Sequence, residues 1–435
     1  MQKKQKKYSI VWFTNNLRTC ENAVLQEAIK SQDNLIAVYF FDPRHYAYTE
    51  YGFKKTEKFR AKFTIQSITD LKANLETLNV PLFTYQNTPE NILPVLVEQF
   101  QVQTIYALKE WTQEEVNVIE SVKKIIPDSV SIKRYYDQFL FHPEDVPIEI
   151  DDIPNVFTNF RKIVEKESVV RPTVELMEFH ENDIHNPTKI PTLQDLGFEE
   201  FETHENSAFP FSGGETQAND RLQDYFFNTK KLGFYKKTRN GLVGIDYSSK
   251  FSPWLANGSI SARTIYWAVR EFETNHFKNQ STYWLIFELI WRDYFKYISL
   301  KHGNAIFKLK GILDKEYDWN TDETDINKWM HGETAEPFVN ANMIELKNTG
   351  WMSNRGRQNV ASYFTKELNL DWRIGASYFE SLLLDYDVHS NYGNWMYVAG
   401  VGNDPRDRKF NVQRQAEIYD PNHKFRNIWL QPTLF

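Results

Sequence analysis

Short apolar runs that alternate with helical stretches restrict the first 140 residues to one class of fold. The strand-like apolar runs occupy residues 8–13, 35–40, 80–85 and 104–108. Stretches with helical periodicity follow them at residues 21–30, 56–79, 89–100 and 112–126. Near-continuous apolar strands are typical of a parallel sheet that helices cover on both faces. The pattern therefore predicts a doubly wound parallel sheet, an α/β domain, over residues 1–140.

Such a sheet binds ligands at the carboxyl ends of its strands, and the first of these ends has no phosphate-binding glycine motif. Thr14-Asn-Asn-Leu-Arg18 follows the first expected strand, where a dinucleotide-binding domain has G-x-G-x-x-G. Dinucleotide binding of the usual kind is therefore disfavoured in this domain.

A different pattern governs the rest of the chain. Residues 141–205 are acidic and punctuated by proline, which indicates an interdomain connector with short helical pieces lying over the surface of both domains. Helical periodicity dominates residues 206–435 and predicts an all-α C-terminal domain. Helix starts are expected at Ser212-Gly-Gly-Glu215, a capping box, and at Ser252-Pro253. Later helices are expected at residues 262–273, 282–300, 323–330, 339–348, 358–368 and 373–385.

Composition excludes several classes of protein. The single cysteine, Cys20, excludes a disulfide framework and any site built from several thiolates, so we expect no metal. No apolar run reaches the ~18 residues of a membrane span, and strand-like residues already begin at Tyr8, which leaves no room for a signal peptide. A net charge of −7 argues against non-selective binding to polyanions. We therefore expect a cytoplasmic protein, a monomer, with no membrane partner.

Aromatic residues make up 15% of the chain, and only Trp12 and Trp111 of the twelve tryptophans precede residue 200. The C-terminal domain therefore has either a large aromatic core or a binding site for planar molecules. Composition does not choose between these two interpretations.

Hydroxyl groups and a cation gather at the start of one expected helix, in Asp246-Tyr-Ser-Ser-Lys-Phe-Ser-Pro-Trp254. Ser248, Ser249, Lys250 and Ser252 precede free backbone N–H groups and the positive end of the helix dipole, which suits a phosphate. A serine-rich turn that only caps the helix would use the same residues. The spacing is not that of a P-loop, so ATP-type binding is unsupported.

The apolar helix expected at residues 282–300 carries a carboxylate. Glu288, Trp291 and Arg292 share one face because they are spaced i, i+3 and i+4. An unpaired buried charge is costly, so Glu288 needs a partner. Two interpretations stay open: a Glu288–Arg292 pair with Trp291 in the core, or a ligand-binding carboxylate beside a stacking indole.

Two later windows combine amides, carboxylates and an arginine. The first holds Asn354, Arg357 and Gln358, and the second holds Asp385, Asp387 and Asn391. A heteroaromatic ring with N–H and C=O edges requires such groups, and so does a buried polar network that is satisfied internally. Beside the phosphate-binding residues, these windows indicate a site for a nucleotide with a large polar ring.

Eight collinear motifs carry a family resemblance. They are Trp12–Arg18, Phe41–Arg44, Gly213–Glu215, Tyr235–Leu242, Asp246–Trp254, Phe287–Asp293, Ser353–Asn359 and Ser390–Trp395. These motifs resemble the photolyase/cryptochrome family, and among its branches the DASH cryptochromes, over essentially the whole chain. Because the sequence stops at Phe435, we expect no extended signalling tail of the plant and animal cryptochrome type.

The resemblance implies FAD, held non-covalently in a U shape inside the helical domain. Tyr235 and the segment Ser248, Ser249, Lys250, Phe251 and Ser252 would hold the pyrophosphate. Asn354, Arg357, Asp385 and Asp387 would bind the isoalloxazine edge, with Arg357 paired to Asp385, and Asn391 would face N5. Glu288 and Arg292 are assigned to the same cofactor site. Trp395, Trp372 and Trp319 match the tryptophan chain that relays electrons from the surface.

The implied reaction is the light-driven opening of cyclobutane pyrimidine dimers, chiefly in single-stranded or looped DNA, by an electron from excited reduced flavin. Glu288 and Trp291 would contact the dimer, and Asn354, Gln358 and Tyr392 would line its cavity. Arg239, Arg355 and Arg406 would hold phosphates. Enzymes that repair (6-4) photoproducts carry histidines at the positions of Asn354 and Gln358, so we expect no (6-4) repair.

The resemblance also implies an antenna pigment, often a folate such as 5,10-methenyltetrahydrofolate. Lys109-Glu110 resembles part of its site, at the end of the fourth expected strand, although a charged loop explains the pair equally well. The sequence departs from the family pattern at Asn340, where aspartate is common, and at Thr334-Ala-Glu336, in place of Thr-Gly-aromatic. Local geometry is therefore expected to differ there.

Two functions of different classes follow. The first is a photoenzyme that repairs dimers, which Glu288, Trp291 and Asn391 favour. The alternative is a blue-light photoreceptor that regulates its partners or its DNA association without repair turnover. A flavin oxidoreductase that works in the dark is disfavoured because no NAD(P) fingerprint is present.

Overall fold

Parallel strands form the sheet of the N-terminal domain in the computed structural model, which describes residues 7–31, 33–174, 184–404 and 406–431. Within these residues the sheet has five strands: β1 (Tyr8–Phe13), β2 (Asn34–Phe40), β3 (Leu82–Tyr85), β4 (Val102–Leu108) and β5 (Ser131–Tyr135). Their order is β3-β2-β1-β4-β5, and all neighbours run parallel. The predicted doubly wound fold is confirmed. Its strand order reverses between β1 and β4, where such folds bind ligands.

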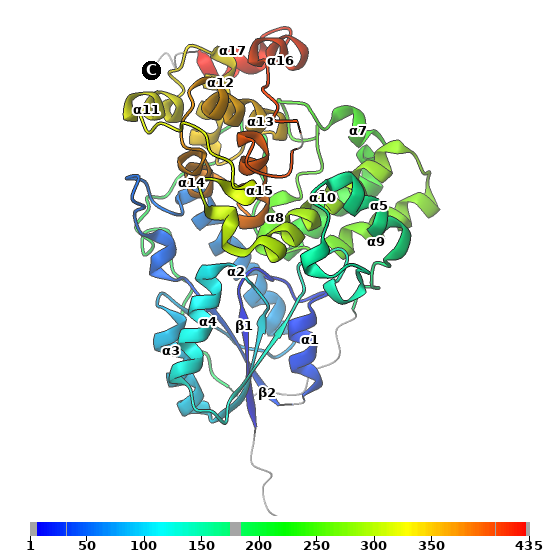
Figure 1. The fold of residues 1–435 in the computed structure, drawn as a ribbon. Coiled ribbons are helices and arrows are strands. Elements are labelled where there is room, and N and C mark those ends of the chain that lie inside the picture. Colours follow the sequence, from blue (N-terminus) through cyan, green and yellow to red (C-terminus); the bar gives the residue numbers. More distant parts are fainter. Residues whose placement is uncertain (1–6, 32, 175–183, 405, 432–435) are drawn as a thin grey trace, which may run out of the picture.

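Helices cover both faces of this sheet (Figure 1). On one face lie α1 (Ala23–Lys30) and α2 (Lys58–Thr77), and on the other lie α3 (Pro89–Phe100) and α4 (Gln113–Ile125). The alternation predicts all of these elements except β5. That strand lies at the sheet edge with partly exposed residues such as Lys133 and Arg134, so no apolar run marks it.

The connector contributes to the core as well as to the surface. Its helix α5 (Phe157–Glu167) buries Phe160 and Val164 completely. The ring of Phe157 stacks on Trp291 of the long helix α10 (Gln280–His302). The expectation that residues 141–205 only cover the surface is therefore wrong for α5, because its apolar side chains share one helical face.

The C-terminal domain is helical, as predicted (Figure 1). Besides α10, its helices are α6 (Glu215–Gln223), α7 (Tyr235–Thr238), α8 (Ser252–Asn257), α9 (Ala262–Asn275), α11 (Glu323–His331), α12 (Pro337–Thr349), α13 (Asn354–Ser362), α14 (Trp372–Leu382), α15 (Val388–Ala399), α16 (Val412–Tyr419) and α17 (Lys424–Leu430). Single π-helical turns extend α6 over Asp224–Asn228 and α13 over Tyr363–Glu367.

Two boundaries differ from the predicted helices and matter for the site. The helix expected at 358–368 begins at Asn354, because Ser353 caps it by accepting the N–H of Gly356 at 2.9 Å. The helix expected at 373–385 ends at Leu382, so Asp385 lies in a turn. Asp387 then caps α15 by accepting the N–H of Ser390 at 2.8 Å.

The predicted capping box at Ser212–Glu215 is wrong. The cap of α6 is Gly214, whose φ is +115°, and Glu215 is the first helical residue. Its carboxylate instead accepts hydrogen bonds from the N–H and hydroxyl of Thr19 (2.8 and 2.9 Å) and from the N–H of Cys20 (2.9 Å). This contact ties the first turn of α6 to the loop that follows β1.

Buried ion pairs fasten the same loop to the helical domain. Asp137 pairs with Arg18 at 2.5 Å and with Arg263 of α9 at 3.0 Å. Gly258, with a φ of +74°, lies so close to this loop that a Cβ atom would be 2.0 Å from the carbonyl oxygen of Asn15. The carboxyl ends of the strands therefore face the helical domain.

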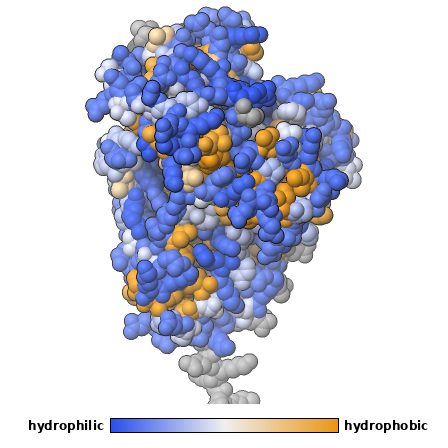
Figure 2. Space-filling model, in the orientation of Figure 1, coloured by the Kyte–Doolittle hydropathy of each residue, from blue (hydrophilic) through white to orange (hydrophobic). Residues whose placement is uncertain are grey.

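The face in Figure 2 is mostly hydrophilic, and its apolar side chains gather in separate patches rather than one band. Among the helices in the described part of the chain, none is long and apolar enough to cross a membrane.

Candidate functional site

A cavity of about 450 Å³ lies in the helical domain between α7, α8, α10, α13 and the turn before α15. A narrower cavity of about 90 Å³ shares Asn354, Arg357, Asp385 and Asp387 with it. The volume of the larger cavity lies in the range of small-molecule and cofactor sites. The predicted residues that line the larger cavity are Tyr235, Arg239, Ser248, Ser249, Lys250, Phe251, Ser252, Glu288, Trp291, Arg292, Asn354, Arg355, Arg357, Gln358, Asp385 and Asp387. Asn391 and Trp395 line the narrower one.

The serine loop that precedes α8 is held in shape by Arg221, a residue that the sequence analysis missed. The guanidinium of Arg221 is buried and donates to the carbonyl oxygens of Ser248 (3.3 Å) and Ser249 (3.2 Å) and to the carboxylate of Asp246 (2.9 Å). The signal was present, because Arg221 lies on the buried face of α6 beside Ala218 and Leu222. An arginine in that position needs acceptors from another segment.

Lys250 lines the cavity, but its amino group packs against aromatic rings. Lys250 Nζ lies 3.3 Å from the ring centroid of Tyr247 and 4.5 Å from that of Trp351. It has no hydrogen-bond partner among the described residues, and burial lowers the pKa of this amine well below its ordinary value. No hydrogen bond joins it to the three serine hydroxyls within the described segments. The geometry therefore does not favour a direct contact between Lys250 and a phosphate.

Glu288 is paired with Arg239, and the predicted alternative of a Glu288–Arg292 pair is wrong. Arg239 Nη2 lies 2.8 Å from Glu288 Oε1. Arg292 instead donates to the carbonyl oxygens of Gln138 (2.6 Å) and Leu255 (2.9 Å). Burial raises the pKa of Glu288, although Arg239 opposes the shift. The carboxylate thus faces the cavity with one cationic partner.

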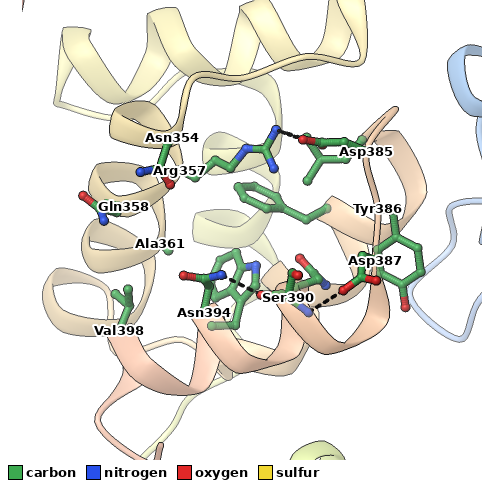
Figure 3. Close-up of a pocket in the computed structure, with 14 residues that line it drawn as sticks. Asn354, Arg357, Gln358, Ala361, Asp385, Tyr386, Asp387, Ser390, Asn394 and Val398 are labelled. Carbon is green, nitrogen blue, oxygen red and sulfur yellow. Dashed lines mark hydrogen bonds and ion pairs between the residues drawn. The ribbon is translucent and has the colours of Figure 1, made fainter. Parts of the chain in front are cut away.

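Arg357 and Asp385 form the ion pair that was predicted. Arg357 Nη2 lies 2.8 and 2.9 Å from the two carboxylate oxygens, and Arg357 Nε donates to the carbonyl of Met352 at 3.0 Å. Figure 3 shows Arg357 reaching from α13 toward Asp385 across the narrower cavity. The early start of α13 places Asn354, Arg357 and Gln358 on one face of its first two turns.

Asp387 and Asn391 also line the narrower cavity. Lys296 of α10, which the sequence analysis missed, donates to Asp387 at 2.8 Å. Burial alone would raise the pKa of Asp387, but Lys296 reverses this and lowers the pKa far below its ordinary range. Asn391 Nδ2 donates to the carbonyl of Ala376 at 2.9 Å, which anchors its amide at the cavity.

The three tryptophans predicted as a relay lie at different depths in the helical domain. The buried Trp395 packs on Gly375 of α14, where a Cβ atom would be 2.3 Å from the indole ring. Trp372 begins that helix, three residues earlier. Trp319 is partly exposed, and its neighbour Asn320 exchanges backbone hydrogen bonds with Asn369 (2.8 Å) and Asp371 (3.0 Å), next to Trp372. The relay through Trp395, Trp372 and Trp319 stays a prediction.

Tyr392 and Arg406 are not among the described residues that line either cavity. The ring of Tyr392 packs between Phe307 (4.8 Å) and Trp372 (6.1 Å), so its predicted place at the cavity wall is wrong. Arg406 is exposed, with its N–H on Asp404 at 3.0 Å.

Tyr397, which the sequence analysis missed, occupies the place expected for Tyr392. It lines the larger cavity, and its ring meets Trp291 edge to face at 6.2 Å. Its position along α15 gives the signal, because Tyr397 follows Asn394 by three residues and Asn394 lines the same wall.

Glu110 lies outside these cavities, at the crevice between β1 and β4. Its carboxylate accepts a hydrogen bond from Asn15 Nδ2 at 2.9 Å, so the residues after the two strands meet. Burial, aided by the neighbouring Glu115, raises the pKa of Glu110 to about 7. The predicted antenna residue thus lies where the strand order reverses.

The two departures from the family pattern compensate one another. Asn340 Oδ1 accepts from the N–H (2.9 Å) and the hydroxyl (2.6 Å) of Thr334, and Asn340 Nδ2 donates back to the Thr334 carbonyl (2.8 Å). An ionised aspartate cannot donate the last of these bonds. The hydrogen bonds that replace the family pattern are therefore confined to residues 334–340.

The donor and acceptor groups of the cavities fit FAD. Trp395 Nε1 is a buried donor atom of a lining residue and has no partner in the described part of the chain. Buried donors of this kind are rare and require an explanation. The serine loop offers hydroxyls for a pyrophosphate, and the Arg357–Asp385 and Lys296–Asp387 pairs offer charged edges for a polar ring.

Comparisons with known proteins agree with this geometry. Residues 9–181 match the family model "DNA photolyase", and residues 284–434 match the model "FAD binding domain of DNA photolyase". The cryptochrome DASH of Danio rerio is 46% identical over 427 residues, which cover 96% of this chain and 81% of the relative. The cryptochrome DASH of Synechocystis sp. is 44% identical over 428 residues, which cover 97% and 87%.

Solved structures show the same fold. The crystal structure of a Synechocystis sp. PCC6803 cryptochrome has a TM-score of 0.94 at 43% identity and covers 98% of this chain and 89% of that one. A bacterial class III photolyase from Agrobacterium tumefaciens has a TM-score of 0.84 at 24% identity, covering 99% and 87%, and thus shares the fold.

Proposed function

The chain belongs to the photolyase/cryptochrome family, with the DASH cryptochromes, and from this premise we propose that it is an FAD-dependent photoenzyme driven by blue light. Its substrate is a cyclobutane pyrimidine dimer, chiefly in single-stranded or looped DNA. One observation carries the proposal. The same continuous lining holds the Arg239–Glu288 pair and Trp291 as well as the Arg357–Asp385 pair that suits a flavin ring.

The serine loop of the larger cavity and the lining that it shares with the narrower cavity would hold the cofactor. Ser248, Ser249 and Ser252 would bind the pyrophosphate, while Arg357, Asp385 and Asp387 would orient the ring. When bound, FAD supplies the absorption of light and the electron that opens the dimer. Electrons that enter from the surface would reach the flavin through Trp395.

Another part of the larger cavity, lined by Glu288, Trp291 and Tyr397, would hold the substrate. Trp291 and Tyr397 meet edge to face and offer an apolar wall for a planar pair of bases. Glu288 offers a hydrogen-bonding group at that wall. Extruding a base from a duplex costs a few kcal/mol, and less from a single strand, so a strand preference follows from the need to fill this cavity.

Arg239 is paired with Glu288 in the structure. We expect Arg239 to divide its charge between Glu288 and a phosphate when DNA binds, while Arg355 holds a second phosphate. Arg355 stacks on Tyr419 at 4.5 Å and donates to Gln358 at 3.0 Å, which orients it beside the cavity. Positions 354 and 358 hold Asn and Gln, and none of the described residues that line the cavities is a histidine that could serve (6-4) repair.

Illumination of the FAD-loaded protein with dimer-containing oligonucleotides tests the proposal. Dimers should disappear from the single strand faster than from the duplex, as followed by chromatography of the oligonucleotides. Glu288→Gln should slow repair by roughly tenfold or more, because a hydrogen bond to a charged group is lost at the substrate, and should leave flavin content unchanged. Glu165→Gln, on the outer helix α5, is the matched control. Loss of dimers from neither substrate would overturn the repair function and leave the photoreceptor alternative.

The crevice beside Glu110 is a second proposed site, for a folate antenna. Asn15 and Glu110 from the ends of β1 and β4 support it. A folate that co-purifies with the protein and is lost in Glu110→Ala would bear it out, and a protein that binds no added folate would contradict it.

A further inference from the structure

Tyr317 lies against the outermost tryptophan of the proposed relay. Its ring centroid is 5.3 Å from that of Trp319, and both side chains are partly exposed. The Tyr317 hydroxyl donates to Asp407 Oδ2 at 3.0 Å. The other carboxylate oxygen of Asp407 accepts from Lys366 Nζ at 2.5 Å. A phenol with a carboxylate partner thus stands next to an indole at the protein surface.

The charges around this phenol decide how it can be oxidised. Lys366 Nζ lies 4.9 Å from the Tyr317 ring centroid and also donates to the carbonyl of Ala399. A nearby cation opposes a positive charge on the ring, but it does not oppose a neutral tyrosyl radical. Oxidation of Tyr317 therefore requires that its proton leave with the electron.

Asp407 is placed to accept that proton. Burial raises the pKa of Tyr317 to about 12, so the phenol holds its proton at rest. Burial alone would raise the pKa of Asp407, but hydrogen bonds from Lys366 and Tyr317 reverse this and lower it. Lys315 adds to the positive charge near this carboxylate. Asp407 is therefore ionised and free to accept at neutral pH.

We propose that Tyr317 is the outermost electron donor of the relay and that Asp407 is its proton acceptor, an inference that rests on the proposed function. The oxidant is the indole cation left on Trp319 after an electron has passed inward through Trp372 and Trp395 to light-excited flavin. One electron passes from Tyr317 to Trp319, and the phenol proton passes from Oη to Asp407 Oδ2. The products are a neutral tryptophan, a neutral tyrosyl radical and a protonated Asp407.

This step prolongs charge separation. The electron can return only when the proton also moves back from Asp407, so recombination is slower than from a tryptophan radical alone. Tyr317 thus gives an external reductant more time to donate its electron at the surface.

Flash photolysis and electron paramagnetic resonance of the FAD-loaded protein test the inference. The parent protein should give a tyrosyl radical after the tryptophan radical. Tyr317→Phe should leave the tryptophan radical and speed recombination by roughly tenfold, which corresponds to a barrier change near 1.4 kcal/mol. Asp407→Asn should likewise leave the radical on tryptophan. Tyr392→Phe is the matched control, because Tyr392 packs on Trp372 but makes no hydrogen bond to a carboxylate among the described residues.

A flavin-free experiment separates this inference from the relay. Azide radicals from pulse radiolysis oxidise exposed tryptophans, and the transfer of the radical to tyrosine can be followed by absorbance. The transfer should be smaller in Tyr317→Phe and Asp407→Asn than in the parent protein. A light-induced tryptophan radical without any tyrosyl radical would overturn this inference alone. Absence of any light-induced radical would overturn the relay, and equal transfer in all azide-treated variants would overturn the Tyr317 step independently.

Discussion

Trp395 shows how much depends on a single side chain. It is 2% exposed, its indole N–H has no partner within the described residues, and its ring fits against Gly375 because that residue has no side chain. Phe364 and Phe379 surround it, and no cation lies over its ring in the described structure. Trp351, by contrast, has Lys250 and Arg357 over its ring. The surroundings of Trp395 therefore suit an indole that is oxidised transiently.

We expect Trp395→Phe to slow flavin photoreduction by roughly tenfold or more, because the first hop of the relay is then longer. Thermal stability should fall by about 1 kcal/mol, since the smaller phenyl ring leaves a cavity where the indole packs on Gly375. Absorbance under steady blue light with an external reductant measures the rate. Trp329→Phe is the control, because Trp329 is buried 6.2 Å from Trp395 but is not a member of the predicted relay. Photoreduction as fast as in the parent protein would refute the relay.

Glu110 gives a prediction for stability against pH. Burial raises its pKa to about 7, whereas the unfolded chain releases this proton near its ordinary value of about 4.3. Protonated Glu110 therefore makes its full contribution to the stability of the folded protein below about pH 4, and this contribution is lost as the pH rises to 7.

In Glu110→Gln the side-chain amide cannot ionise but still accepts the hydrogen bond from Asn15. The variant should therefore not lose stability as the pH rises. Between pH 5 and pH 8 the parent protein should lose on the order of 1–2 kcal/mol relative to the variant, a value reduced for the partial exposure of the site. Thermal unfolding of both proteins across this range measures the difference. A constant difference would show that the carboxyl group titrates normally.

At the scale of elements, the first turn of α6 fastens the two domains together. Glu215 accepts three hydrogen bonds from Thr19 and Cys20, and removal of the carboxylate leaves those buried donors without an acceptor. Glu215→Ala should therefore destabilise the protein by about 2–4 kcal/mol. Glu215→Gln keeps one acceptor oxygen and should cost less.

Chemical denaturation of both variants, with limited proteolysis of the loop after β1, measures this effect. Glu200→Ala, an exposed glutamate of the connector, is the control. Equal unfolding midpoints for Glu215→Ala and the control would mean that the contact does not stabilise the domain interface.

At the scale of the whole molecule, the net charge of −7 makes DNA binding depend on a local basic rim. The cations available for this rim include Lys230, Lys231, Lys236, Lys237, Arg239, Arg355, Arg406, Arg408 and Lys409. Several of these cations are already paired: Lys231 with Asp246, Arg239 with Glu288, Arg408 with Asp404 and Lys409 with Glu367. Fewer cations are thus free for phosphates than the sequence suggests.

The affinity for single-stranded DNA should therefore fall only modestly with salt. With three to five phosphates neutralised, log Kobs against log salt should have a slope of about −2 to −3.5. Lys237→Ala should reduce the slope by about 0.7, whereas Arg408→Ala should change it less because Asp404 already neutralises that arginine. Fluorescence anisotropy at several salt concentrations measures these slopes. A slope of zero would remove DNA as the partner.

The sequence by itself determined the class of each domain, most of the helices and strands, and the set of residues that gathers around the cavity. Periodicity and capping are local properties, encoded within a few neighbouring residues, so they are readable from the chain. The Arg357–Asp385 pair was implied by the family resemblance, and strand order predicted only that Glu110 lies at the carboxyl end of a strand.

Only the tertiary structure decided which groups become partners across the chain. Glu288 had Arg292 four residues away, yet it pairs with Arg239 because α7 packs against α10 and Arg292 is taken by two carbonyl groups. Glu215 likewise binds a loop almost two hundred residues earlier instead of capping its own helix. Tyr397, not Tyr392, faces the cavity because the packing of α15 against α10 and α14 fixes its rotation. Such choices depend on how whole elements pack, which no short stretch of sequence records.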